Sequence, residues 1–75
     1  MSKANAERDA LIMSNARGMI KLKARSTNAH LYSDLFGTGF GTATRRCVDL
    51  GYDPCSNKTE YNEAIDYIAK NYNDD

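Results

Sequence analysis

The run from Gly37 to Thr42, Gly-Thr-Gly-Phe-Gly-Thr, has the residue types of a loop that binds phosphate. Glycines leave backbone N–H groups open to an anion, and a helix that starts after such a loop adds the positive end of its dipole. The dinucleotide-binding loop and the P-loop both follow a β-strand, and the P-loop also contains a lysine. Here a helical pattern precedes the glycines and no lysine completes the motif. We therefore interpret the run as a flexible turn between two helices.

Other residues with catalytic or metal-binding chemistry are few and scattered. Cys47 and Cys55 are eight positions apart and His30 is the single histidine, whereas a zinc site needs about four ligands. Acidic pairs at helical spacing, Glu60 with Glu63 and Glu63 with Asp66, are more typical of a solvated helix face than of an acid–base dyad. We expect no catalytic site, no metal and no cofactor, and hence a protein that is not an enzyme.

The sequence also favours a cytosolic protein. No apolar run approaches the roughly 20 residues that span a bilayer, and the start of the chain lacks the apolar stretch of a secretory signal. In a cytosolic setting two free thiols are expected rather than a disulfide, with Cys47 as a small core residue and Cys55 in a loop. These observations predict no contact with a membrane.

The charges are divided along the chain, although their total is zero. Residues 1–46 hold eight Lys and Arg residues against three Asp and Glu residues, a net charge of +5. Residues 47–75 hold two against seven, a net charge of −5. A charge split of this kind concerns what a surface contacts more than which fold forms. It predicts two contact surfaces of opposite sign.

Two candidate surfaces follow from this division. The basic face combines a stripe at spacings of four on the first helix with two cations on the third helix: Arg17, Lys21, Arg25, Arg45 and Arg46. The stripe is predicted to point away from the core, and its position near a helix C-terminus is also favourable for the helix dipole. The acidic-aromatic face lies on the last helix and comprises Glu60, Glu63, Asp66 and Tyr67. Tyrosine is enriched in interface hot spots, which makes this second face a candidate protein contact.

Positioning these faces requires helices, because strand signals are nearly absent. Apolar residues at helical spacing predict four helices at about 5–24, 29–36, 42–50 and 59–72. The first would bury an arc that includes Leu11, Ile12, Met13, Ala16 and Met19. Gly37 suits a left-handed C-terminal cap, Thr38 or Thr42 would cap the third helix, and Gly51 would end it. The predicted fold is an all-α, compact single-domain bundle of residues 1–75, with a frayed tail at 73–75.

Three functions are compatible with this pattern. The leading hypothesis is a small non-enzymatic binding module that docks stoichiometrically on a protein partner. Such a module would be an adaptor or inhibitor of the accessory kind encoded by phages and mobile elements. The alternative is a helix-turn-helix regulator that binds DNA through the second and third helices. Its glycine-rich turn looks longer than the usual three or four residues, and the chain is neutral where nucleic-acid binders are basic. The third is self-association, in which the basic face of one copy meets the acidic face of another.

Overall fold

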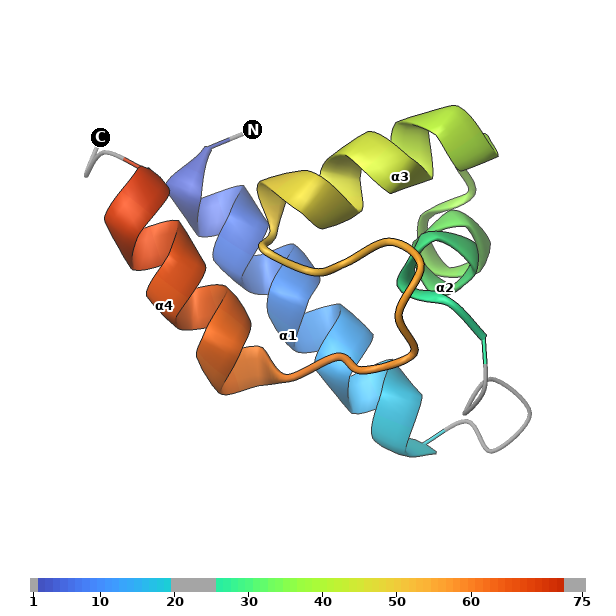
Figure 1. Ribbon diagram of the computed structural model, residues 1–75, viewed down its shortest axis with the longest axis horizontal. Helices are drawn as coiled ribbons and strands as arrows, with labels where there is room; N and C mark the ends of the chain where they lie inside the picture. Colours follow the sequence, from blue (N-terminus) through green and yellow to red (C-terminus); the bar gives the residue numbers. More distant parts are fainter. Residues whose placement is uncertain (1, 20–25, 73–75) are drawn as a thin grey trace.

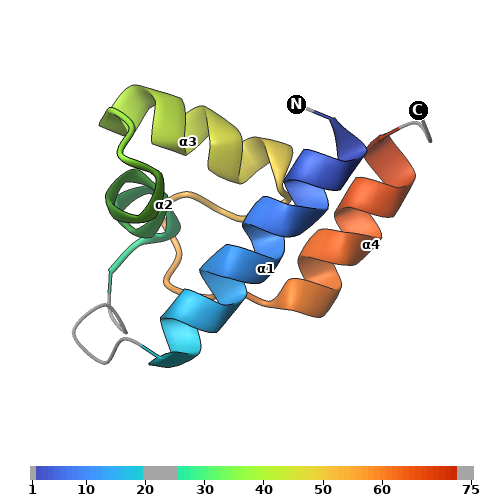
Figure 2. The same cartoon turned by 180° about the vertical axis from the view of Figure 1, so that it is seen from behind.

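The computed structural model describes residues 2–19 and 26–72, and the regular secondary structure in these ranges is helical. The elements are α1 (Lys3–Met19), α2 (Asn28–Phe36), α3 (Phe40–Asp49) and α4 (Tyr61–Asn71). Helix α4 runs antiparallel beside α1, whereas α3 crosses α2 steeply at the other side of the molecule (Figure 1). The view from behind shows α1 in front, with the α3–α4 connection passing behind it (Figure 2). The predicted all-α fold of four helices is confirmed, while the predicted tail at 73–75 lies outside the described residues.

One hydrophobic cluster joins the four helices. Small side chains supply much of α1's share, with Ala6 and Ala10 fully buried, and such residues let neighbouring helices approach closely. The α3–α4 connection adds Tyr52, whose hydroxyl contacts the Ala10 carbonyl at 3.2 Å and the Ser14 hydroxyl at 2.9 Å. The buried apolar residues of the cluster are Ala6, Ala10, Met13, Ala16, Leu31, Tyr32, Ala43, Cys47, Leu50, Tyr52, Ala64 and Ile68.

The buried face of α1 differs from the predicted one. Leu11, Ile12 and Met19 were expected in the core, but they are 44%, 38% and 81% exposed. The helix instead buries a rotated arc that is made of small residues, one methionine and one carboxylate: Ala6, Asp9, Ala10, Met13 and Ala16. Close packing against neighbouring helices favours the alanines, and a hydrogen bond from another helix makes burial of the carboxylate tolerable. The larger apolar side chains are left facing outward.

The connection between α2 and α3 is shorter than the sequence suggested. Helix α2 starts after Thr27, whose hydroxyl accepts a hydrogen bond from the His30 N–H at 3.3 Å, and its C-cap is Gly37, with φ 66°. The left-handed Gly37 agrees with the prediction, and the helix starts one residue before the predicted position 29. Helix α3 begins at Phe40 rather than at residue 42, and its N-cap is Gly39 without a side-chain hydrogen bond. Neither Thr38 nor Thr42 caps it, and the turn is only the three residues 37–39.

Candidate functional site

Helix α3 has one buried and one exposed side. Ala43, Cys47 and Leu50, the last at its C-terminal cap, point into the core. The opposite side is defined here as the α3 outer face, comprising Phe40, Gly41, Thr44, Arg45 and Val48, of which all but the half-buried Thr44 are exposed. Because these residues recur at spacings of three and four, they form one continuous stripe along the helix. The stripe runs from the first residue of α3 almost to its last.

Contacts from α2 hold α3 in place. The Ser33 hydroxyl donates to the Thr38 carbonyl at 2.6 Å, which closes the turn. The His30 and Phe40 rings have centroids 5.0 Å apart, so the first residue of α3 rests on a side chain of α2. The left-handed conformation of Gly37 lets the chain leave α2 sharply. Together these features fix the direction in which the α3 outer face points.

Two arginines mark the edge of this face. Arg45 is exposed, while Arg46 is half-buried and lies 3.9 Å from the Asp49 carboxylate, measured from Nη1 to Oδ2. An ion pair this long, between side chains that are 41% and 44% exposed, contributes little stability. The two arginines, with Thr42 and Asp49, line a shallow hollow of about 150 Å³. Guanidinium groups in such a setting keep donors for an external acceptor.

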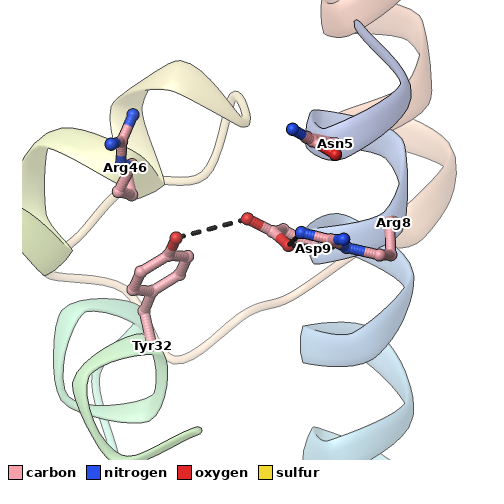
Figure 3. Close-up of a pocket in the computed structure, with 5 residues that line it drawn as sticks. All are labelled: Asn5, Arg8, Asp9, Tyr32 and Arg46. Carbon is pink, nitrogen blue, oxygen red and sulfur yellow. Dashed lines mark hydrogen bonds and ion pairs between the residues drawn. The ribbon is translucent and has the colours of Figure 1, made fainter. Parts of the chain in front are cut away.

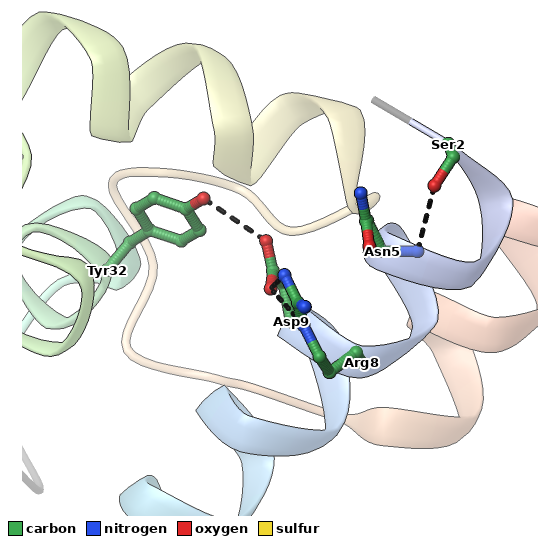
Figure 4. A network of polar contacts seen from close by, with 5 residues as sticks. All are labelled: Ser2, Asn5, Arg8, Asp9 and Tyr32. Atoms are coloured by element: carbon green, nitrogen blue, oxygen red, sulfur yellow. Dashed lines mark hydrogen bonds and ion pairs between the residues drawn. The ribbon is translucent and has the colours of Figure 1, made fainter.

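A second hollow of about 230 Å³ lies between α1, α2 and α3 and shares Arg46 with the first. Asp9 is only 4% exposed there. Its carboxylate accepts a hydrogen bond from the Tyr32 hydroxyl at 3.2 Å and lies 3.4 Å from the Arg8 guanidinium (Figure 3). Asn5 is the remaining lining residue, and its backbone N–H donates to the Ser2 hydroxyl at 3.2 Å, which caps α1 (Figure 4).

Burial of Asp9 was not predicted from the sequence, although the signal was present. Asp9 falls on the same arc as Ala6, Met13 and Ala16, at spacings of three and four. Burial, then the charge of Asp9 and the hydrogen bond to it, raises the pKa of Tyr32 to about 12. The hydroxyl therefore stays protonated at neutral pH and donates continuously. A pKa so far from 7 does not suit general acid–base catalysis at neutral pH. The hydrogen bond between Tyr32 and Asp9 instead connects α2 to α1.

The basic stripe was predicted to point away from the core, but Arg17 does not. Its Nε donates to the Thr59 hydroxyl at 3.0 Å and its Nη2 to the Asn28 side-chain oxygen at 3.1 Å. Burial lowers the pKa of Arg17. The guanidinium turns inward because a buried polar group, Asn28, needs partners. The other two members of the stripe, Lys21 and Arg25, lie outside the described residues.

Asn28 is the centre of this polar cluster and is fully buried. Its amide nitrogen donates to the carbonyls of Asp53 and Lys58 at 2.9 and 2.8 Å. Its oxygen also accepts from the Thr59 hydroxyl at 2.6 Å. One side chain thus joins α1, α2 and the α3–α4 connection. We call this group of Arg17, Asn28 and Thr59, with the two carbonyls, the Asn28 latch.

The acidic-aromatic face lies on α4 and its N-cap residue, away from α2 (Figure 1). Glu60, Glu63, Asp66 and Tyr67 are all exposed, and Tyr67 is 37% exposed. The α3–α4 connection lies directly against this tyrosine. A Cβ added at Gly51 would stand 2.6 Å from the Cβ of Tyr67. The contact restricts where the ring can point, which lowers the entropy lost on binding.

The two thiols have different surroundings. Cys47 is fully buried and Cys55 is exposed, both as free cysteines, and burial raises the pKa of Cys47 to about 12. Among residues 2–19 and 26–72, no three His, Cys, Asp or Glu side chains gather as a metal site would require. No helix in the described ranges is long and apolar enough to cross a membrane.

No protein-family model, curated protein or solved structure matches this chain. The surfaces of the molecule are therefore what indicate its function. The predicted site residues within the described ranges lie in separate places: Arg45 and Arg46 on α3, Arg17 in the Asn28 latch, and the acidic-aromatic face on α4 and its N-cap.

Proposed function

We propose that the chain binds duplex DNA through α2, the turn 37–39 and α3, with α3 as the recognition helix. The observation that carries the proposal is the geometry of this unit. Two steeply crossed helices are joined by three residues that include a left-handed glycine, and the second helix exposes the side that faces away from the core. A helix of this kind enters the major groove with its N-terminal residues against the bases.

The α3 outer face carries chemistry that suits base edges. Arg45 is exposed in the middle of the stripe, and arginine is the commonest bidentate partner of guanine in the major groove. Thr44 offers a hydroxyl and a methyl group, while Phe40 at 54% exposure offers an apolar contact for a thymine methyl. Gly41 lets the backbone come close. Arg46, beside the stripe, is suited to a phosphate.

The zero net charge is a weak objection to this proposal. The anions that balance the chain include Glu60, Glu63 and Asp66, which belong to α4 and its N-cap. Helix α4 packs beside α1, and α3 packs on α2, so the N-terminal half of α4, where these residues lie, is away from the proposed groove-binding helix (Figure 2). Phosphates are attracted by local positive charge, and the Debye length of about 8 Å at physiological salt limits the reach of distant anions.

The test is binding of fluorescent duplex DNA, first as a pool of random sequence and then as the sequence selected from that pool. Arg45→Ala should weaken binding to the selected duplex about 5- to 150-fold, the discrimination expected of one good bidentate contact. Lys70→Ala, which removes one exposed cation from α4, is the matched control and should leave affinity unchanged. Absence of binding at low salt, or equal losses for both variants, would overturn the proposal.

A second candidate function is docking on a protein partner through the acidic-aromatic face. The observation in its favour is the contact between Gly51 and Tyr67, which restricts an exposed aromatic ring among carboxylates. In pull-downs from source cells, one partner should be recovered by the native chain and lost with Glu63→Lys or Tyr67→Ala. Asn62→Ala on the same helix is the control. Recovery that ignores all three substitutions would eliminate this candidate.

A further inference from the structure

We infer that the α3 outer face selects a duplex in which a guanine and a thymine lie on adjacent base pairs, and that it recognises the thymine by its C5-methyl group. This selectivity rests on the proposed DNA binding and names the class of sequence that α3 takes. Three features point to it: the residue types of the face, the hydrogen bond that occupies the Thr44 hydroxyl, and two exposed apolar side chains.

The side chains of the face leave few bases to recognise. In the major groove, Asn and Gln are the usual partners of adenine, and Asp and Glu accept from the cytosine amine. The α3 outer face has none of these residue types, since it consists of Phe40, Gly41, Thr44, Arg45 and Val48. Asp49, at the end of α3, lies against Arg46 instead. What remains is a guanidinium, which pairs with guanine, and apolar groups, which contact a methyl group.

The Thr44 hydroxyl is already used within the helix. It donates to the Phe40 carbonyl at 2.9 Å, so its proton is not free for an acceptor on a base. This bond also selects one of the two side-chain rotamers that threonine commonly adopts in a helix. What Thr44 keeps for a base edge is therefore chiefly its methyl group, which suits contact with a thymine methyl.

Phe40 and Val48 extend this apolar surface in both directions. They are 54% and 51% exposed, and neither belongs to the hydrophobic cluster of the core. With Thr44 between them, they form a row at spacings of four along one side of the helix. Valine is a weaker helix former than most residues of exposed helix positions, and here it gains no burial in return. The fold therefore does not explain Val48, whereas contact with a base does.

The position of Arg45 places the two bases next to each other. Arg45 follows Thr44 by one residue and precedes Val48 by three, which is about 1.5 Å and 4.5 Å along the helix axis. Successive bases of a strand are about 3.4 Å apart. A guanidinium on guanine therefore leaves the apolar row against a neighbouring base pair. Thymine suits that place because it presents a methyl group in the major groove, whereas cytosine presents an amine.

Single-group changes in the DNA test the methyl group directly. The duplex selected from the random pool should contain thymine next to guanine, and replacing that thymine by uracil removes only the methyl group. Affinity should fall about fourfold, the effect of one buried methyl group. Cytosine at the same place should bind more weakly still. 5-Methylcytosine should bind about fourfold more tightly than cytosine but less tightly than thymine, because its amine finds no acceptor on the face.

Protein variants assign the effect to the apolar row. Thr44→Ser combined with Val48→Ala keeps a hydroxyl for the Phe40 carbonyl and removes methyl groups, so the ratio of thymine to uracil affinity should fall close to one. Arg45→Ala should weaken binding to both duplexes and keep the ratio. Asn62→Ala, on the exposed side of α4, is the control and should change neither. Circular dichroism should show the native helical content in every variant.

The outcomes separate this selectivity from DNA binding itself. Equal affinity for the thymine and uracil duplexes, or a ratio that persists in the double variant, would overturn the inference and leave the proposed DNA binding intact. Absence of binding to every duplex at low salt would overturn both. A 5-methylcytosine duplex that binds more tightly than the thymine duplex would overturn the assignment to thymine.

Discussion

Substituting Asn28 by alanine should remove a large part of this domain's stability. The side chain is fully buried and makes four hydrogen bonds to described residues, from 2.6 to 3.1 Å long. A net contribution of about 1 kcal/mol per hydrogen bond gives about 4 kcal/mol for the variant. A domain of this size is stable by roughly 4–11 kcal/mol, so between a third and nearly all of the stability is at stake. The melting temperature should fall by about 15–30 °C.

Two further variants separate the parts of the Asn28 latch. Thr59→Val keeps the shape of the side chain and removes the bond to Asn28 and the one from Arg17, so it should cost less than Asn28→Ala, about 2 kcal/mol. Asn28→Asp keeps the oxygen that Arg17 and Thr59 contact, but turns a carboxylate toward the carbonyls of Asp53 and Lys58. The loss of both donors and the repulsion should make it as damaging as alanine.

Urea unfolding followed by circular dichroism measures these losses, provided that the slope with denaturant stays constant across the variants. Asn62→Ala, on the exposed side of α4, is the control and should lie within about 0.5 kcal/mol of the native chain. Hydrogen exchange adds a local test, because the N–H groups of Asn28 and Ala29 bond to the carbonyls of Ser56 and Pro54. If Asn28→Ala behaves like the control in both measurements, the latch does not hold the connection to α2, and the reasoning fails.

Two further predictions concern glycines and thiols. Gly18→Ala should stabilise the chain by about 0.5–1 kcal/mol, because nothing lies within 4 Å of the added carbon. Gly51→Ala should destabilise it by more than about 1 kcal/mol, because φ is +79° and the added carbon would stand 2.6 Å from Tyr67. Chemical unfolding that ranks the two variants in the opposite order would contradict this. At pH 8 a thiol reagent should modify Cys55 promptly and Cys47 only after unfolding. The pKa of Cys47 rises from 9.0 to about 12 on folding, so the thiol of the unfolded chain ionises first as pH increases. The free energy of unfolding should therefore fall between about pH 9 and pH 12, and it should fall less steeply in Cys47→Ala. Prompt reaction of both thiols, or a Cys47→Ala pH profile as steep as the native one, would refute this.

Local patterns were enough to predict much of the fold. Thr27 and Gly37 are residue types that favour the two ends of a helix, and the structure uses both in those roles. The stripe of α4 is apolar at clean helical spacing, so Ala64 and Ile68 are buried as its pattern indicates. In these segments propensity, capping and periodicity agree, which is why no tertiary information was needed.

The long-range polar contacts could not be predicted in this way. Tyr32 pairs with Asp9 across 23 positions, and Arg17 with Thr59 across 42. Helical spacing can indicate that Asp9 is buried, but it does not indicate which distant residue such a side chain contacts. The rotation of α1 has the same origin, since side-chain size favours Leu11 in the core whereas close packing selects alanine. The early start of α3 also depends on a tertiary contact, that of His30 with Phe40, which overrides the weak helix propensity of glycine.

The charge pattern limits how tightly the proposed DNA-binding helix, α3, can hold a duplex. Arg17 is turned into the Asn28 latch and is not available to DNA. Among the described residues, Arg45 and Arg46 are therefore the cations that α3 offers to phosphates and bases. Even with both arginines counted as phosphate contacts, the slope in a plot of log affinity against log salt is about −2, which is shallow for a DNA-binding protein. A chain with so few cations on α3 should bind DNA weakly at physiological salt, so binding should be measured across a salt series. Arg46→Ala should make the slope shallower by about one, whereas Lys70→Ala should leave it unchanged. An unchanged slope in Arg46→Ala would contradict the assignment of Arg46 to a phosphate.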